Sequence, residues 1–219
     1  MTAADPASRD TRSERQVVVG LEIHAQLATG RKLFCGCATD AGAEPNTNIC
    51  PTCVGHPGAL PTLDGVAVEL GMRAALALEC RVAPALRFDR KAYGYPDLPK
   101  GYQMTQQDHP LGEDGGFVFR DELGSVRRVG VLRAHLEEDA GRIVRGAGVE
   151  VTDGECLVDL NRAGVPLLEI VLAPELGRAG DAAACLRALR RLLRHLGVAD
   201  CVLEQGGFRC DVNISLCGG

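Results

Sequence analysis

The sequence contains no tryptophan, and only three tyrosines and five phenylalanines stand among its 219 residues. Apolar residues still make up 46% of the chain, so a buried core is expected and must be largely aliphatic. No run of about 18 apolar residues is present to span a bilayer. Residues 1–15 also lack the apolar stretch of a signal peptide. These absences predict a cytoplasmic globular protein with a disordered tail at residues 1–15.

An excess of basic residues is missing as well. The formal net charge is -5, so the chain as a whole gives no electrostatic sign of a nucleic-acid partner. The phosphate-binding loops G-x-G-x-x-G and G-x-x-x-x-G-K-[ST] are both absent, and any nucleotide site must therefore be of another type. The motif Gly-x-Ser-x-Gly is absent too, which argues against a serine hydrolase.

Cysteine, in contrast, is abundant, with ten in the chain. Four of them form two short pairs, Cys35-x-Cys37 and Cys50-x-x-Cys53, which together could supply the four thiolates of a tetrahedral zinc site. A redox pair and ordinary buried thiols are the alternatives, whereas a disulfide framework would normally accompany a secretion signal. Because four thiolates leave no open coordination position, the pattern predicts a structural zinc knuckle at residues 34–54.

The hydrophobic pattern predicts more strands than helices. Residues 16–27 and 208–216 alternate apolar and polar side chains, as strands with one buried face do. In the last of these, the apolar residues from Phe208 to Leu216 are expected to pack against the core. Strands that recur without strict helix alternation favour an α+β fold with a mostly antiparallel sheet. Shorter strands are predicted at residues 117–119, 126–133, 157–160 and 167–172, and a long ordered loop at residues 84–107.

Two helices are predicted from periodicity and capping. Asp64 can cap a helix that runs to about residue 79, and Asp181 can begin a second helix that ends before Gly197. The inward side chains are expected to be Val68, Met72, Ala75 and Leu76 in the first helix, and Cys185, Leu189, Leu192, Leu193 and Leu196 in the second.

Acidic residues and a histidine occur where strands are predicted. Glu22 and His24 share the polar face of the first strand, for which exposure to solvent is the simplest alternative. A second group, residues 135–139, reads His-Leu-Glu-Glu-Asp. Glu169 interrupts an otherwise apolar run, where an unpaired carboxylate would be costly. Carboxylates and an imidazole on one sheet surface would suit Mg²⁺, which often also binds phosphates.

Six stretches of the chain, in order, resemble the B subunit of the glutamyl/aspartyl-tRNA amidotransferase and its archaeal E relative. They cover nearly all of residues 17–215, and the stretch at residues 157–171 is the most specific. The matching stretches are VGLEIHAQL (19–27), FCGCATDAGAEPNTNICPTCVGHPGALP (34–61), FDRKAYGYPDLPKGYQMTQ (88–106), HLEEDAG (135–141), LVDLNRAGVPLLEIV (157–171) and RCDVNIS (209–215).

The resemblance implies a glutamine-synthetase-like antiparallel sheet and an enzyme that works on mischarged tRNA. ATP would phosphorylate the side-chain carboxylate of Glu or Asp on tRNA(Gln) or tRNA(Asn). Ammonia from a glutaminase A subunit would then displace the phosphate, within a heterotrimer that includes a small C subunit. The family's tRNA contacts lie largely in C-terminal domains, which makes the acidic net charge compatible with this function.

The family's catalytic Mg²⁺ ligands correspond by motif to Glu22, His24, one of Glu137 and Glu138 (the second is favoured here), and Glu169. Three carboxylates so close would repel one another without a cation, so the pKa of at least one is expected to rise. The four cysteines match those of zinc-bearing members. Further substrate-binding candidates are Tyr93, Tyr95 and Lys100 in the long loop, and Arg209, Asp211 and Asn213 on the last strand.

Residues 16–219 are therefore expected to form the family's N-terminal catalytic domain, here a fragment, because family members continue well past this point. Two alternatives remain for its function. One is a non-catalytic zinc-bearing module for RNA binding or assembly, and the other is a ligase that joins ammonia to a small free carboxylic acid. Activity that depends on mischarged tRNA would separate them.

Overall fold

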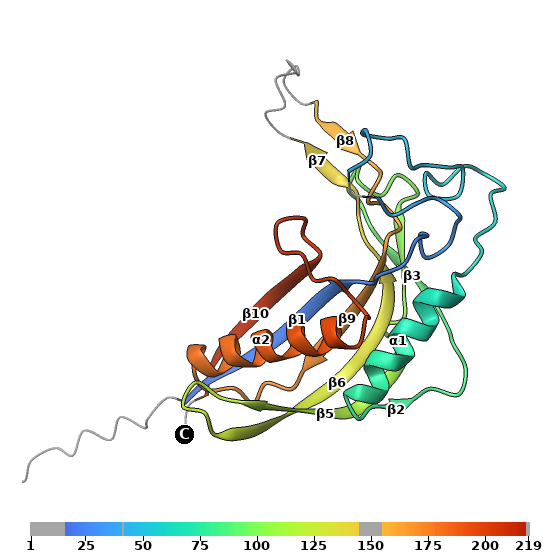
Figure 1. The fold of residues 1–219 in the computed structure, drawn as a ribbon. Helices are drawn as coiled ribbons and strands as arrows, with labels where there is room; N and C mark the ends of the chain where they lie inside the picture. The colour runs from blue at the N-terminus through green and yellow to red at the C-terminus, as the bar shows by residue number, and fades with distance from the viewer. Residues whose placement is uncertain (1–15, 41, 145–154, 218–219) are drawn as a thin grey trace, which may run out of the picture.

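The computed structural model describes residues 16–40, 42–144 and 155–217 (Figure 1). The tail predicted at residues 1–15 lies outside these ranges. Among the described residues, neither helix is long and apolar enough to cross a membrane. The strands are β1 Gln16–Gln26, β2 Arg81–Val82, β3 Asp89–Ala92, β4 Tyr102–Thr105, β5 Gly112–Arg120, β6 Val126–Glu138, β7 Arg142–Val144, β8 Leu157–Asp159, β9 Pro166–Leu172 and β10 Phe208–Cys217, and the helices are α1 Gly65–Ala77 and α2 Ala179–His195.

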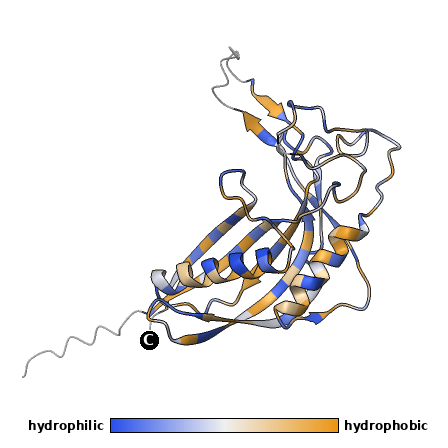
Figure 2. Ribbon diagram, viewed as in Figure 1, coloured by the Kyte–Doolittle hydropathy of each residue, from blue (hydrophilic) through white to orange (hydrophobic). Residues whose placement is uncertain are grey.

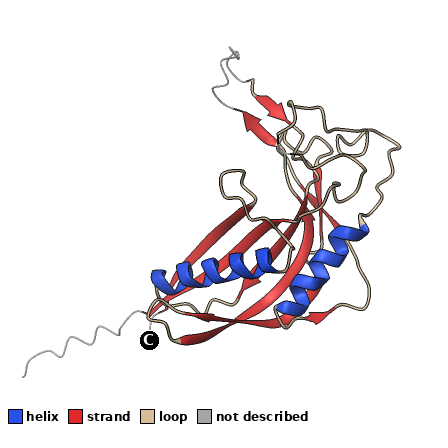
Figure 3. Ribbon diagram, in the orientation of Figure 1, coloured by secondary structure: helices blue, strands red, loops and turns tan. Residues whose placement is uncertain are grey.

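The strands form one large antiparallel sheet and a separate hairpin. The main order is β10-β1-β9-β6-β4-β3, with β5 pairing with both β6 and β2, while β7 pairs with β8. Every strand pair in the described ranges is antiparallel. The α+β class with a mostly antiparallel sheet is thus confirmed. Figure 3 shows both helices along one side of this sheet.

Strand β1 explains why the sheet has one apolar and one polar face. Val19, Leu21 and Ile23 are buried in the same core as residues of both helices, whereas Glu22 and His24 point to the other side. Figure 2 shows the same alternation as successive bands of colour along the strands. The helices therefore cover the apolar face and leave the polar face of the central strands without a helix.

Helix α1 begins as predicted, with the Asp64 carboxylate accepting a hydrogen bond from the Val66 amide. Its predicted inward face is right for Ala75, which is buried, and for Val68, which packs partly buried against the core, but wrong for Met72 and Leu76, which are 36% and 65% exposed. Ala67, Gly71 and Ala74 face the core instead. The helix is apolar on most sides, so periodicity alone did not separate its faces. Small residues are buried because the helix packs closely. A Cβ at position 71 would lie 2.9 Å from Leu136 Cδ2.

Helix α2 agrees better with its sequence pattern. It begins at Ala179 rather than Asp181, which lies in the first turn and is buried. Cys185, Leu189 and Leu193 are fully buried, and Leu192 and Leu196 are partly buried against the same core. Gly197 follows the helix with a positive φ of 64°, the backbone conformation expected just after a helix C-terminus.

Two other predictions need correction. The stretch at residues 84–107 is not a loop throughout, because it contains the antiparallel pair β3 and β4. Strand β10 does not bury its apolar side chains as expected. Phe208 is buried, but Val212, Ile214 and Leu216 are exposed, Ile214 by 69%. The reason is topological, since β10 lies at the edge of the sheet and has β1 as its neighbour on one side.

Candidate functional site

Cross-strand register brings the polar side chains together on the open face of the sheet. His24 of β1 lies opposite Glu169 of β9, and Glu169 in turn lies opposite His135 of β6. Residues directly opposite each other in antiparallel strands share a face and lie close enough for side-chain contact. Two residues further along β6, Glu137 projects from the same face. The site therefore depends on three adjacent strands rather than on one loop.

His24, Glu137 and Glu169 form the tightest group on this face. His24 Nε2 lies 3.4 Å from Glu169 Oε2 and 3.5 Å from Glu137 Oε1. One ligand atom from each of the three residues falls within 4.8 Å of the others. Glu137 and Glu169 are buried, while His24 is partly exposed at 18% of its side chain. The group is thus accessible from one side only.

Glu138, the ligand favoured on sequence grounds, is not in this group. Because neighbouring residues on a strand point to opposite faces, Glu138 projects to the side opposite Glu137. There it is buried, forms an ion pair with Lys100 and accepts a hydrogen bond of 3.0 Å from the Met104 amide. The expected grouping with His24 and Glu169 is therefore wrong for Glu138, and Glu137 takes its place.

Glu22 lies on the expected face but outside the three-residue group. It pairs in register with Asp211 of β10, and its Oε1 accepts a hydrogen bond of 3.2 Å from Asn213 Nδ2. Asn213 is exposed, and Glu22 is partly exposed like His24. Glu22 could reach a substrate or a second cation over the face, whereas the geometry does not place it on the same cation as His24.

The charges around Glu169 oppose the expected rise in carboxylate pKa. Burial alone would raise the pKa of Glu169, but the hydrogen bond with His24 and the positive charges of His135, His24 and Arg133 lower it below its ordinary value. The same hydrogen bond raises the pKa of His24, partly offset by burial. The expected rise is therefore not found for Glu169, because basic groups surround it and Glu138 faces away.

A shallow depression of ≈ 380 Å³ opens beside this group. Its lining includes Tyr93, Arg209 and Asp211, which the sequence predicted as substrate-binding residues. It provides room for a substrate next to the candidate ligands. The complete lining is His24, Tyr93, Gln103, Glu137, Asp139, Ala140, Leu167, Arg209 and Asp211.

The remaining substrate-binding candidates have different surroundings. Arg209 donates two hydrogen bonds to Asp139, of 2.9 and 3.2 Å, so much of its guanidinium is already engaged. Tyr95 is 66% exposed and packs edge-on against Tyr93, with ring centroids 5.5 Å apart. Lys100 is held by Glu138 on the other face. Of the six candidates, all of them described residues, Tyr93, Arg209 and Asp211 line the depression.

Sequence reasoning included His135 and Asp139 in the group at residues 135–139 but gave them no individual role, and it missed Arg133. His135 and Arg133 lie two and four residues before Glu137, which places them on the same side of β6, and alternation along the strand was the available signal. Asp139 anchors Arg209 and also accepts a hydrogen bond of 2.8 Å from Gln26 Nε2. No local pattern could reveal that contact, because Gln26 and Asp139 are 113 residues apart.

The four clustered cysteines meet as the spacing predicted, with their sulfur atoms all within 4.8 Å of one another. The Cys50 and Cys53 sulfurs are 3.9 Å apart. Tetrahedral Zn–S bonds of about 2.3 Å require roughly 3.8 Å between sulfurs, so this donor set fits zinc. All ten cysteines are free thiols. The residues therefore fit a structural zinc ion without any large rearrangement.

The electrostatics of the cysteine cluster also favour a cation. A hydrogen bond from Cys35, stronger than the opposing effect of burial, lowers the pKa of Cys53 to about 4, with the nearby Lys32 ammonium contributing. The pKa of Cys35 rises in turn through the same hydrogen bond and burial. Lys32 is fully buried and donates a hydrogen bond of 3.2 Å to the Leu160 carbonyl. Its positive charge would partly offset the excess negative charge of four thiolates around zinc.

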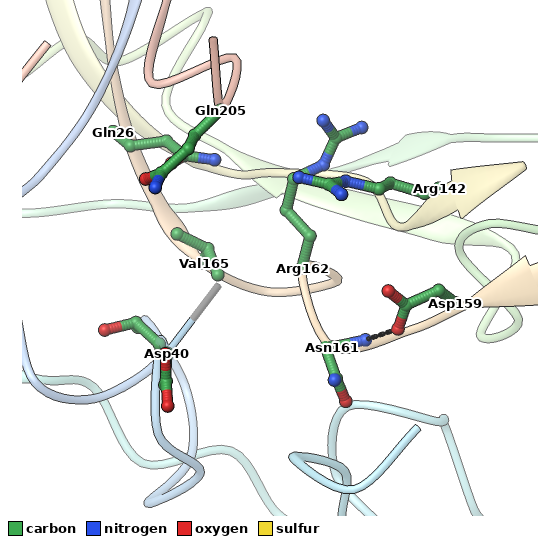
Figure 4. Close-up of a pocket in the computed structure, with 9 residues that line it drawn as sticks. Gln26, Asp40, Arg142, Asp159, Asn161, Arg162, Val165 and Gln205 are labelled. Carbon is green, nitrogen blue, oxygen red and sulfur yellow. Dashed lines mark hydrogen bonds between the residues drawn. The ribbon is translucent and has the colours of Figure 1, made fainter. Parts of the chain in front are cut away.

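A second hollow lies beside the cysteine loop, near the base of the β7–β8 hairpin (Figure 4). Its volume is ≈ 30 Å³, which is enough for about two water molecules. Its polar groups are largely engaged with neighbours. Arg162 donates to the Ala140 and Gly141 carbonyls at 2.8 and 2.7 Å, and Asp159 accepts from the Asn161 amide at 2.9 Å. This hollow is better explained as a hydrated structural junction than as a ligand site.

Comparison with known proteins identifies the family to which the chain belongs. Residues 17–219 match the family described as the GatB/GatE catalytic domain. The chain is 53% identical over 204 residues to the B subunit of the aspartyl/glutamyl-tRNA(Asn/Gln) amidotransferase of Myxococcus xanthus, and 50% identical over 203 residues to that of Moorella thermoacetica. Each alignment covers 93% of this chain and 42% of the relative. The chain thus spans less than half the length of these relatives, and it belongs to the GatB/GatE catalytic-domain family.

Proposed function

We propose that this chain carries the carboxylate-activating site of a tRNA-dependent amidotransferase. Its substrate would be Glu or Asp esterified to tRNA(Gln) or tRNA(Asn), and its product the corresponding Gln-tRNA or Asn-tRNA. Support comes from the family match over residues 17–219, from the names of the relatives, and from the cluster of His24, Glu137 and Glu169 beside an open depression. The cluster is the observation that carries the proposal.

The proposed reaction has two steps. In the first, a side-chain carboxylate oxygen attacks the γ-phosphorus of ATP. A new P–O bond forms, the bond to the β-phosphate oxygen breaks, and ADP leaves. In the second, ammonia attacks the acyl carbon, the C–O bond to phosphate breaks, and phosphate and the amide are released as nitrogen loses a proton. The first step is needed because a free carboxylate is a poor electrophile.

His24, Glu137 and Glu169 would hold one Mg²⁺, a cation that usually takes one or two protein carboxylates and leaves other positions to water and phosphate. When bound, it would neutralise negative charge on the phosphates during transfer. Two carboxylate oxygens and one imidazole within 4.8 Å of one another fit that role. Glu22 and Asp211, further along the same face, would meet the substrate or water around the site.

The depression gives the remaining residues their proposed roles. Tyr93 and Arg209 line it and would contact the aminoacyl end of the tRNA or the nucleotide. Asp139 would keep Arg209 oriented through its paired hydrogen bonds. The cysteine cluster would hold zinc as a structural ion. We further propose that the sheet is of the glutamine-synthetase-like type and that the protein acts in the cytoplasm.

The ammonia would come from a partner. The proposed assembly is a heterotrimer with a glutaminase A subunit and a small C subunit, because no nucleophile arrangement of a glutaminase is recognisable in the sequence. The tRNA would be held largely by parts of the relatives that lie outside the matched 42% of their length. ATP, Mg²⁺ and Zn²⁺ are the proposed cofactors or cosubstrates.

ADP release by the protein, completed to the length of its relatives and joined to its partners, would test the proposal. We expect release with Glu-tRNA(Gln) or Asp-tRNA(Asn) and none with uncharged tRNA or free glutamate. Release with free glutamate alone would support the small-acid ligase instead. No release with any acceptor, although tRNA binds, would support the non-catalytic zinc-bearing module.

A further inference from the structure

His135 of β6 is a buried imidazole without an obvious purpose in the fold. Its side chain is 1% exposed and lies on the same face as Arg133 and Glu137. Across the described ranges, neither of its ring nitrogens has a hydrogen-bond partner. A buried polar group without a partner costs free energy, and such groups in folded proteins usually have a functional or ion-related explanation.

The carboxylates of two candidate cation ligands lie close to His135. Its Nε2 lies 3.6 Å from Glu169 Oε2 and 3.8 Å from Glu137 Oε2, just beyond hydrogen-bond length. Glu137 turns its other oxygen, Oε1, toward His24. The two histidines therefore approach the carboxylate pair from different strands, His24 from the more open position and His135 from the buried one.

The grouping of ligand atoms argues against His135 as a ligand of the same cation. His24, Glu137 and Glu169 each offer an atom to a group whose members lie within 4.8 Å of one another, and His135 is not a member of it. A cation held by those three would meet His135 only through the carboxylates. In protein metal sites, groups that hydrogen-bond to ligating carboxylates orient them and tune the affinity of the site.

We propose that His135 is a positioning residue for this cation site. Its Nε2–H donates to Glu137 Oε2 once their separation of 3.8 Å closes by roughly 0.6 Å or more, while Arg133 Nη2, 3.5 Å from Glu169 Oε1, restrains the second carboxylate. These contacts leave Glu137 Oε1, Glu169 Oε2 and His24 Nε2 facing the cation. The inference rests on the cation site of the proposed function and adds to it a residue that makes no contact with the cation.

Calorimetric titration of the purified chain with Mn²⁺, as a stand-in for Mg²⁺, tests this role. His135→Leu removes the donor and is expected to weaken Mn²⁺ binding by about 10- to 100-fold, the range seen when such supporting contacts are lost. His135→Gln keeps an N–H donor at similar reach and should bind Mn²⁺ within about threefold of the unmodified chain. His109→Gln, at an exposed histidine, is the matched control and should change nothing.

The outcomes separate this inference from the function on which it rests. Unchanged Mn²⁺ affinity in His135→Leu would overturn the positioning role. Equal losses in His135→Leu and His135→Gln would overturn it as well, because the imidazole itself would then be needed as a ligand. Absence of Mn²⁺ binding by the unmodified chain would instead refute the cation site. Thermal melting without cation checks the fold, and His135→Met replaces His135→Leu if the latter does not fold.

Discussion

The substitution Glu169→Gln tests the cation site most directly, because it removes the charge and keeps the shape. Glu169 would supply one of the three proposed ligand atoms, and its carboxylate lies within 3.4–3.6 Å of His24, Arg133 and His135. Losing one of only two carboxylates should weaken divalent cation binding by at least about 100-fold, a factor similar to that seen when one main electrostatic group is removed from an active site. Thermal melting with and without Mn²⁺ measures the effect on the chain itself.

The expected shifts in melting temperature follow from mass action. At a cation concentration about 100-fold above its Kd, binding stabilises the native state by about 2.7 kcal/mol. For a chain of this size, that raises Tm by roughly 5–11 °C. If Glu169→Gln binds about 100-fold more weakly, the same concentration gives only about 0.4 kcal/mol, or roughly 1–2 °C. An equal cation-induced rise in the two proteins would remove Glu169 from the site.

The cation-free proteins should differ in a pH-dependent manner. The lowered pKa of Glu169 stabilises the fold above its ordinary value of 4.5, and this contribution is lost as the pH falls through the folded pKa. The raised pKa of His24 stabilises the fold below its ordinary value of 6.5, and this stabilisation is lost as the pH rises through the folded pKa. Glu169→Gln should therefore lower the cation-free Tm most between pH 4.5 and 6.5. A higher Tm in that window would show that repulsion dominates the site.

Three further predictions concern neighbouring features. Glu137→Gln should abolish most Mn²⁺ binding measured by calorimetry, whereas Glu138→Gln, on the opposite face, should retain it. The reverse result would mean that the two faces of β6 are assigned wrongly. Elemental analysis of protein purified without added metal should find about one zinc per chain, and the double substitution Cys50→Ser, Cys53→Ser should remove it. Unchanged zinc content would mean that the four cysteines are ordinary buried thiols and not zinc ligands. The isolated chain should form no Gln-tRNA from Glu-tRNA with glutamine as the nitrogen donor, and amide formation under those conditions would contradict the proposed division between subunits.

Alternation along strands explains what could be predicted from the sequence and what could not. On β1, period-two alternation correctly assigned Leu21 and Ile23 to the core and His24 to the polar face, because the helices cover the apolar face of this strand. On β10 the same pattern predicted burial wrongly, because alternation indicates which face of a strand is apolar but not whether another element covers that face. Ile214 stands at an apolar position of the alternating pattern, as a core residue would, but it lies on the edge strand and is exposed.

The choice between Glu137 and Glu138 shows the same limit at the site. Sequence alone located the acidic pair, but which member faces His24 depends on the register of β6 against β9. A slip of one residue exchanges the two faces of a strand. The observed pairing of His135 with Glu169 fixes that register and places Glu137 on the polar face. The cysteine cluster, in contrast, was predictable because its ligands lie within a single short loop.

Strand β6 lies between the proposed cation site and the cysteine loop, because Glu137 projects to the site on one face and Glu138 projects to Lys100 on the other. Gly55 of the cysteine loop packs on Lys100. Glu138 holds Lys100, and the loop after Cys53 packs so closely on Lys100 that a Cβ at Gly55 would collide with its backbone and Cβ. Gly55 also has a φ of 75°, which costs any other residue about 1–2 kcal/mol.

Gly58 provides a matched control for this contact, because it has a φ of 82° and open space around its Cα. Gly58→Ala should therefore cost only the backbone strain, whereas Gly55→Ala should cost about 1–3 kcal/mol more through overpacking. Chemical denaturation of the two variants measures that difference. Equal losses would mean that the loop moves away from Lys100 without penalty.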